Sequence, residues 1–592
     1  MKKLYFKICL YVSLLLPIVS CDDFIDPAPE NILGKDDIYY RPNLAQGLLI
    51  NAYLRIPTNG WSFSEMATDD AVSNDLTNGY LNMATGQWAS NSNPVDRWTS
   101  AQSAIQYINV VLEEIDEVNF SEIPSVNQMF SDRIKGEAYG LRALFMYYLL
   151  QAHGGVAGGE LLGIPINLQS QNVSSDFNQP RSTFEQCMDQ LYTDVDQALA
   201  LLPMDYQNIN DEALVPAQYR ELGAKASDYN RAFGDDAIQL LSGRIALAVK
   251  AQAALLAASP AFNLSSDQSK WAEAAEYSGD ILTDIGGLSG MDPQGHTWYA
   301  NTSEIDNIGG GANPREILWR TTIGDANNSL EAQNFPPTLF GEGLVNPTQN
   351  LVEAFPMASG YPIGDPASGY LAEAPYQGRD PRLQAFIVVN GSTAGASNKV
   401  IDTAQDSETN DGLNKVESST RTGYYLRKLL RQDVNLDPVS NSQQRHIQPR
   451  IRYTEIFLIY AEAANEAWGP TAMGNYSFSA YDVIKAIRQR AGIGLSNGDP
   501  YLESIKGDQE AMRNLIRNER RLELSFEGFR FWDLRRWDLS LTETAKGIRI
   551  MNDSDYAVIN VENRVYADYM IYGPVPYSEI LKFAALQQNS GW

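Results

Sequence analysis

Residues 516–537 read IRNERRLELSFEGFRFWDLRRW, and this stretch decides how the chain folds. Glu519, Glu523 and Glu527 stand four residues apart on the predicted helix, where they repel one another unless cations lie beside them. Arginines follow closely in the sequence, and we expect four of them to pair with these carboxylates: Arg521, Arg530, Arg535 and Arg536. Leaving one member of a buried ion network unpaired is strongly destabilising. The stretch is therefore interpreted as part of a rigid scaffold rather than as a ligand contact.

Amphipathic helices are predicted on the N-terminal side of this stretch and within it. Apolar residues recur at helical spacing in two blocks, about 98–285 and 450–530. The individual helices are predicted over 98–115, 134–152, 184–202, 244–258, 271–285, 456–467, 481–491 and 511–526. Alanines crowd the fourth of these segments and let neighbouring backbones approach closely. The pattern predicts a mainly α fold of tetratricopeptide-type helical hairpins, although no strict sequence repeat is visible.

A long irregular stretch, about 286–449, separates the two blocks. It is rich in Gly, Pro, Asn and Ser, and its apolar runs, such as 316–322 and 383–390, are short. Such stretches are uncommon in compact chains unless they have a function, and binding loops on a rigid scaffold are the usual one. We predict a large loop-rich insertion that contains short strands.

The N-terminus predicts export and lipid attachment. Three lysines precede an apolar run over 8–19 that is too short to span a bilayer, and Cys21 follows directly. We expect residues 1–20 to be a lipoprotein signal peptide, Cys21 to be acylated, and 21–32 to form a tether. Acyl chains hold a protein to a membrane by about 0.8 kcal/mol per buried CH₂. An ordinary secretory leader with an incidental cysteine is the alternative, and 33–592 are predicted to form a single domain.

The charge of the chain limits its partners. It has 45 basic and 73 acidic residues, a net charge of −28, which becomes −31 when the three lysines of 1–20 are removed. Such an acidic body repels nucleic acid and polyanions, so a neutral ligand is favoured. Cys9 lies in the signal and Cys21 is acylated, which leaves Cys187 without an intramolecular disulfide partner. No second apolar run is long enough for a transmembrane helix.

Several motifs, taken in order along the chain, resemble the SusD/RagB family of surface nutrient-binding lipoproteins. The stretch 516–537 carries the strongest resemblance. The others are Trp98 with 107–109, 137–138, 142–143, 153–155, 163–165, 181–183, 243–244, 453–455 with 461–463, and 574–576 with 588–589. The resemblance covers nearly the whole chain and implies a SusD-like scaffold.

The same resemblance implies a function. Family members lie on the outer face of a Gram-negative outer membrane, anchored by lipid, as a lid over a SusC-like TonB-dependent transporter. They capture an oligosaccharide or polysaccharide and deliver it to the pore without chemistry. Asp22 and Asp23, behind the acylated cysteine, resemble the acidic export signals of surface lipoproteins.

Two segments are predicted to contribute ligand contacts. Within 59–97, Trp61, Tyr80 and Trp88 stand among small polar residues without helical periodicity, and Asp70 resembles a family aspartate near the ligand face. A sugar that covers a third of an aromatic side chain gains about 1–2 kcal/mol. For each ring, packing in the core is the alternative.

The insertion supplies the second set. Trp298 and Tyr299 stand about where the family often provides aromatic binding residues. Arg382 and Tyr424 match further family segments and are expected mainly to anchor loops, with ligand contact as their alternative role. We expect Trp88→Ala to weaken binding of a neutral oligosaccharide and Trp532→Ala to affect mainly folding.

Two other functions remain as alternatives. A peptide receptor of RagB type would use the same scaffold. A surface glycoside hydrolase needs two carboxylates about 5–10 Å apart, and the 73 acidic residues leave such a pair open. No HExxH, GxSxG or Walker motif is present and the three histidines are far apart, so we expect no enzyme activity. No cofactor is expected, and the residues neither require nor exclude a structural calcium ion.

Overall fold

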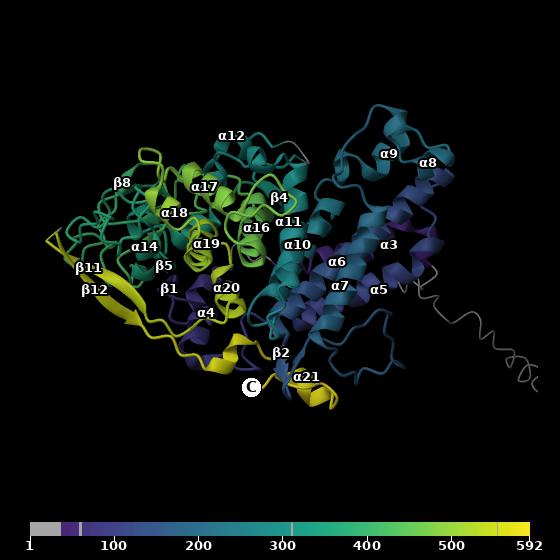
Figure 1. Ribbon diagram of the computed structural model, residues 1–592, viewed down its shortest axis with the longest axis horizontal. Coiled ribbons are helices and arrows are strands. Elements are labelled where there is room, and N and C mark those ends of the chain that lie inside the picture. Colours follow the sequence, from purple (N-terminus) through teal and green to yellow (C-terminus); the bar gives the residue numbers. More distant parts are fainter. Residues whose placement is uncertain (1–36, 58–61, 309–311, 553) are drawn as a thin grey trace, which may run out of the picture.

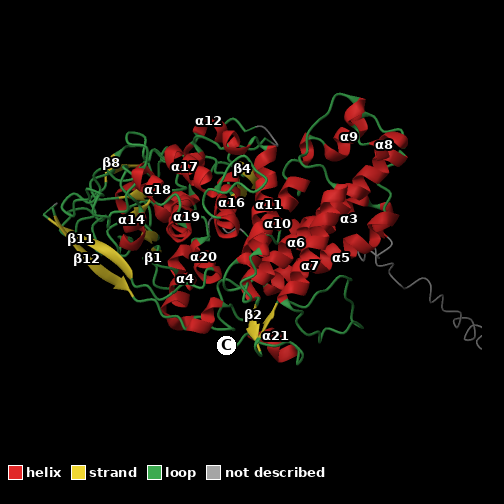
Figure 2. Ribbon diagram, in the orientation of Figure 1, coloured by secondary structure: helices red, strands yellow, loops and turns green. Residues whose placement is uncertain are grey.

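The computed structural model describes residues 37–57, 62–308, 312–552 and 554–592 (Figure 1). The predicted signal peptide, Cys21 and the tether lie outside the described residues, as does Trp61. Helices form most of the regular structure, and the strands are short and paired in twos (Figure 2). The predicted mainly α fold is confirmed.

A layered array of helices forms one half of the molecule, on the right in Figure 1. Helix α5 packs on α6, α6 on α7, α7 on α10, and α10 on α11. The members are α2 (Asp37–Tyr40), α3 (Pro42–Tyr53), α5 (Trp98–Glu114), α6 (Pro124–His153), α7 (Phe184–Leu201), α8 (Ala217–Glu221), α9 (Ala226–Phe233), α10 (Gly243–Ala258) and α11 (Ser269–Asp284). Their bounds confirm the predicted helices of the first block, except that α6 begins ten residues earlier, at Pro124.

Local signals explain where two of these helices begin and why two of them pack closely. Thr183 and Gln186 form a reciprocal capping box at the start of α7, and the Ser242 hydroxyl accepts from the backbone N–H of Ile245 at the start of α10. On α6, a Cβ added at Gly140 would lie 2.3 Å from the Leu241 side chain. The absence of a side chain at this position therefore lets the segment before α10 lie directly against α6.

The second helical block connects the two halves of the molecule. It consists of α16 (Tyr453–Trp468), α17 (Ala480–Arg490), α18 (Pro500–Ser504), α19 (Gln509–Glu523) and α20 (Arg530–Arg536). Helix α16 packs against α11 on one side and α19 on the other, and it is central in Figure 1. One hydrophobic core runs from α3 through α11 into α16, α17 and α19.

The insertion has a core of its own, which includes Val345, Leu383, Tyr425 and Leu522. Its elements are short, as predicted: α12 (Thr302–Ile305), α13 (Ser329–Asn334), α14 (Gln349–Ala354), α15 (Pro381–Phe386), β4 (Ile317–Arg320), β5 (Val345–Pro347), β6 (Ile387–Val388), β7 (Thr393–Ala394), β8 (Lys399–Val400) and β9 (Tyr425–Leu426). The elements from elsewhere in the chain are β1 (Ala71–Ser73), α4 (Gly79–Asn82), β2 (Gly155–Ala157), β3 (Glu160–Leu162), β10 (Pro449–Arg452), β11 (Ala545–Met551), β12 (Asp555–Glu562) and α21 (Tyr577–Lys582). All strand pairs are antiparallel: β1–β5, β2–β3, β4–β10, β6–β9, β7–β8 and β11–β12.

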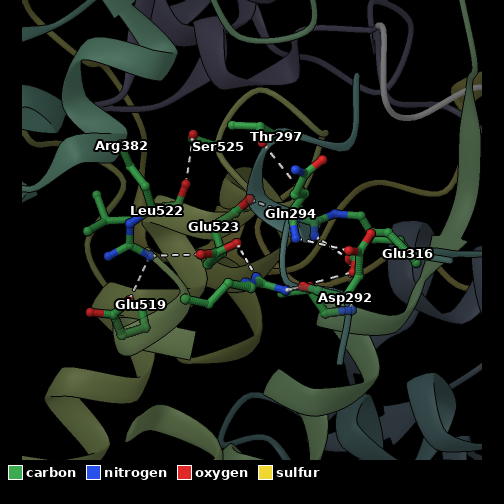
Figure 3. A network of polar contacts seen from close by, with 12 residues as sticks. Asp292, Gln294, Thr297, Glu316, Arg382, Glu519, Leu522, Glu523 and Ser525 are labelled. Atoms are coloured by element: carbon green, nitrogen blue, oxygen red, sulfur yellow. Dashed lines mark hydrogen bonds and ion pairs between the residues drawn. The ribbon is translucent and has the colours of Figure 1, made fainter. Parts of the chain in front are cut away.

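The glutamate ladder is buried in an ion network, with Glu519 and Glu523 on α19 and Glu527 beyond its end, but its partners differ from those predicted. Figure 3 shows Arg382 beside Glu519 and Glu523. Cations from other elements hold the three carboxylates: Arg382 and Arg488 at Glu519, Arg382 and Arg490 at Glu523, and Lys428 and Arg452 at Glu527. The predicted arginines have other partners: Arg521 and Arg530 pair with Asp69 and Asp70, and Arg536 pairs with Glu462 and Asp533. The structural role is thus confirmed, whereas the predicted local pairing is wrong.

Three buried glutamates give folding a distinctive dependence on pH. Burial raises the pKa of Glu65, Glu137 and Glu455 to about 7 each. A carboxyl group whose pKa is raised in the folded state favours folding while it is protonated. This contribution is complete below the unfolded-state pKa of about 4.3 and is lost as the pH rises to about 7.

The free energy of unfolding of the wild type should fall between pH 5 and pH 8. We expect this fall to be smaller in Glu65→Gln, by up to about 3 kcal/mol, because glutamine does not ionise. The glutamine keeps a side-chain oxygen to accept from the backbone N–H of Gly528, as Glu65 does. Urea unfolding at the two pH values measures the difference, and Glu160→Gln, at an exposed position, is the control. An unchanged pH dependence in Glu65→Gln would contradict the prediction.

Candidate functional site

An outer groove of about 290 Å³ opens where the start of α5 meets α6 and α20. Rings from three elements line it: Tyr80 of α4, Tyr148 of α6 and Trp532 of α20. Arg97 lies among them, with its guanidinium carbon 4.9 Å from the Tyr148 ring centroid and 5.3 Å from that of Trp532. The polar part of the lining is completed by Arg55, Asp96 and three serines, Ser62, Ser64 and Ser100.

An inner cavity of about 50 Å³ lies next to this groove. The two hollows share Pro57, Tyr148 and Trp532 as lining residues, so a single layer of side chains separates them. The inner cavity collects residues from both halves of the molecule: Tyr147 and Gln151 of α6, Gln252 of α10, Trp298, Thr321, Leu429, Gln448, Arg450 of β10, Glu455 of α16, Glu527 and Phe529.

Burial shifts the pKa values of several charged groups that line the two hollows. Burial lowers the pKa of both Arg97 and Arg450. Burial also acts to raise the pKa of Asp96, but hydrogen bonds from the His153 ring and from the backbone N–H of Trp98 hold that pKa below its usual range. The Glu455 carboxyl accepts a 2.7 Å hydrogen bond from the Gln252 amide. Aromatic faces therefore stand beside cationic donors and carboxylate acceptors, a combination that can bind a polyhydroxylated ligand.

Two residues that were expected to contact ligand, Trp88 and Asp70, lie in the packed interior of the protein. The Trp88 ring is 4% exposed, and its Nε1 donates to the Asn93 side chain. It lies 4.8 Å from the Trp592 ring and 5.7 Å from the Phe531 ring. Asp70 is fully buried, and its carboxylate accepts from Arg521 at 2.7 Å. Both residues lack surface for a ligand, so the structure corrects their role to core packing and charge pairing.

Three residues of the insertion are corrected in the same way. Arg382 is fully buried between Asp380, Glu519 and Glu523. Tyr424 is also fully buried, and its hydroxyl donates to Gln349. Tyr299 packs in the insertion core, where its hydroxyl donates to the carbonyl of Ala385.

Tyr80 and Trp298 are the two predicted residues that line a hollow. Tyr80 is partly buried and forms part of the outer groove. Trp298 is almost fully buried, but its ring lines the inner cavity, and its indole Nε1 has no hydrogen-bond partner among the described residues. Their role as ligand contacts stays a prediction, which their positions support.

Sequence reasoning missed most of the site. Trp532 was predicted to act in helix packing, and Arg97, Tyr148, Arg450 and Glu455 were not singled out. Tyr148 belongs to the buried face of α6, and its place in the groove follows only from the approach of α20 and β10. No local signal marks it. Arg450 could have been noticed as an arginine two residues before the paired Arg452.

The described residues were examined for two further features, a group of metal ligands and a membrane-spanning helix. In the parts of the chain that the structure describes, no three His, Cys, Asp or Glu side chains are grouped to hold a metal ion. Within the same residues, no helix has the length and apolar character needed to cross a bilayer.

Family models match the chain in two places. Residues 315–592 match the model described as the SusD family, and 23–217 match the model described as starch-binding and associating with the outer membrane. The chain belongs to the SusD/RagB family. The second description also associates its SusD-like members with the outer membrane.

Individual SusD-like proteins are similar over nearly the full length. A SusD-like protein of Formosa agariphila is 21% identical over 96% of this chain and 95% of its own length. Among solved structures, a SusD-like protein of Bacteroides fragilis has a TM-score of 0.70 at 23% identity, covering 94% of this chain and 98% of that one. A SusD-like carbohydrate-binding protein of the same organism has a TM-score of 0.66 at 20% identity, covering 92% and 99%. These likenesses establish the SusD-like fold.

Proposed function

We propose that this protein is a cell-surface glycan receptor that binds an oligosaccharide in the outer groove and delivers it to a SusC-like TonB-dependent transporter. The observation that carries the proposal is the meeting of Tyr80, Tyr148 and Trp532 with Arg97 in one groove. Sugar rings have one apolar face and a rim of hydroxyls, which aromatic and charged side chains match.

The family supports this proposal. One matching model is described as starch-binding, and similar solved structures include a SusD-like carbohydrate-binding protein and a surface glycan-binding protein of Bacteroides fluxus. The sequence predicts acylation of Cys21, which would hold the receptor at the outer membrane, facing the cell exterior. A tethered receptor at that surface needs a pore for its cargo, and this is the role proposed for the SusC-like partner.

Binding without cleavage is the expected outcome. Asp96, Glu455 and Glu527 are the carboxylates that line the two hollows among the described residues. Asp96 is held by His153, and Glu527 by Lys428 and Arg452. A glycosidase needs two carboxylates that flank the bond to be broken, whereas Asp96 is the one carboxylate among the described residues that line the outer groove.

The test is a calorimetric or gel-retardation screen of residues 22–592 against neutral and acidic polysaccharides, with product analysis for every ligand found. Binding without products supports the receptor. Released sugars would contradict it in favour of a hydrolase, and binding of extended peptides instead of any glycan would favour the RagB-type receptor.

We expect Tyr80→Ala to weaken glycan binding about 10-fold, because the sugar loses one aromatic face worth about 1–2 kcal/mol. Isothermal titration calorimetry measures the change with the ligand found in the screen. Tyr277→Ala is the matched control, since Tyr277 is also partly buried and lines neither hollow. Equal affinity of the Tyr80→Ala protein and the wild type would remove Tyr80 from the site.

A further inference from the structure

The inner cavity is lined by a half-buried arginine, Arg450, that forms no ion pair among the described residues. The Arg450 guanidinium carbon lies 4.7 Å from the ring centroid of Trp319, and Nε and Nη1 are buried without a hydrogen-bond partner among the described residues. Two residues later, Arg452 pairs with Glu316 and Glu527. Buried arginines are ordinarily paired, since an unpaired buried charge is costly.

Within the described parts of the chain, no carboxylate forms an ion pair with Arg450, although two line the same cavity. Burial lowers the pKa of Arg450, and the neighbours that oppose the lowering are the phenols of Tyr148 and Tyr53. Of the two carboxylates in the cavity, Glu527 accepts from Arg452 and from Lys428. The other, Glu455, has its pKa raised to about 7 by burial, so near neutral pH it is protonated about half of the time.

Three other polar atoms of the described lining residues are buried without a partner. The Trp298 indole Nε1 is a donor, Glu455 Oε2 donates when the carboxyl is protonated and accepts when it is ionised, and Gln151 Oε1 is an acceptor. An incoming group with several acceptor oxygens and a negative charge would satisfy these donors.

Size restricts the group further. A volume of about 50 Å³ holds about three to five waters, since each needs about 10–15 Å³ by this measure. It is enough for a carboxylate or a sulfate but not for a sugar ring. The adjoining outer groove, at about 290 Å³, has the larger space and shares Tyr148 and Trp532 with the cavity.

From these contacts we infer that the inner cavity is a subsite for an anionic substituent of the glycan, a carboxylate or a sulfate held by Arg450 and Trp298. The inference rests on the proposed function and narrows its substrate class to acidic oligosaccharides. It replaces the neutral ligand expected from the net charge, because a local cation outweighs the distant acidic surface inside a cavity of low dielectric. Arg450 presents a planar fork of donors, which matches the geometry of a carboxylate.

The experiment compares each acidic oligosaccharide with its own neutral form. Uronic-acid oligosaccharides are titrated against their carboxyl-reduced forms, and sulfated oligosaccharides against their desulfated forms. We expect the acidic member of the binding pair to bind at least 10-fold more tightly, as for a buried hydrogen bond to a charged group. The pair that shows the preference identifies carboxylate or sulfate as the recognised group.

Arg450→Gln should abolish that preference while leaving the melting temperature unchanged or higher, because it removes an unpaired buried charge. Arg517→Gln is the matched control: Arg517 also lies over a tryptophan, 5.0 Å from the Trp537 ring centroid, also has its pKa lowered by burial, and lines neither hollow. It should keep the preference.

Three outcomes would overturn the inference. Equal binding of acidic and neutral forms by the wild type would remove the anionic subsite while leaving the glycan receptor intact. A preference that survives in Arg450→Gln would also remove it. Failure of every glycan to bind would overturn the proposed function and this inference with it.

Discussion

Arg382→Met is expected to lower the free energy of unfolding by about 3–5 kcal/mol. Arg382 is fully buried and joins three carboxylates, with Nη1 2.9 Å from both Glu519 and Glu523 and Nη2 2.7 Å from Asp380 (Figure 3). Its positive charge is one of the reasons that the pKa of Glu523 stays well below its usual range, against the raising effect of burial. Removal of the arginine leaves Asp380 buried without a cation.

Guanidinium unfolding followed by tryptophan fluorescence measures this loss. Arg513→Met is the matched control, since the Arg513–Glu466 pair is partly exposed and should contribute less than about 1 kcal/mol. Adding Asp380→Asn to Arg382→Met should recover part of the loss, because asparagine can still accept from the backbone N–H at the start of α15 but carries no charge. A loss below about 1 kcal/mol in Arg382→Met would mean that the network does not hold the fold.

Trp88→Ala should destabilise the protein by about 3–5 kcal/mol and leave glycan affinity unchanged. The ring packs against Phe531, Tyr566 and Trp592 and lines neither hollow. This reverses the expectation from sequence. Trp532→Ala should instead weaken glycan binding as well as folding, because Trp532 lines both hollows.

Thermal unfolding together with calorimetric titration separates the two effects. Trp88→Phe should lose less stability than Trp88→Ala, since it keeps an aromatic ring in the cluster. The titration is carried out well below the melting temperature, so that both variants are folded. Weakened binding by a folded Trp88→Ala protein would return Trp88 to the site and contradict the packing described above.

The helices could be predicted from sequence because their signals are local. The apolar spacing of α7 and α10, together with the caps at Thr183 and Ser242, depends only on residues within the same segment. The predicted bounds accordingly agree within a few residues for seven of the eight helices, the exception being the start of α6. Insertion strands such as β6 and β9 have only two residues each. The sequence could therefore predict that short strands are present in the insertion but not where they lie.

The site could not be predicted in the same way. A tryptophan among polar residues has the same local pattern whether it lies on the surface or inside the protein, and Trp88 is inside because Phe531 and Trp592 come to it from distant segments. The sequence near Asp70 likewise predicts a hydrogen-bond acceptor for a ligand, because Arg521, which neutralises this carboxylate, is far away in the chain. The charge of Arg450 is informative only in the structure, where none of the described carboxylates pairs with it.

The pairing of Asp69 with Arg521 sets the order in which the protein can fold. These residues are 452 positions apart, and they meet where Asp69 is buried and Arg521 is partly buried. At about 5–20 residues per second, the ribosome completes Arg521 about 20–90 s after Asp69. Until then the two aspartates have no cation, so their burial is unfavourable.

The segment around β1 must therefore wait for α19 before it can close, whereas the helices up to α11 do not depend on this pairing. We expect a protein that ends before α19 to retain those helices but to lack an ordered segment around β1. The two aspartates thus make the closure of this one region depend on a segment that is made much later.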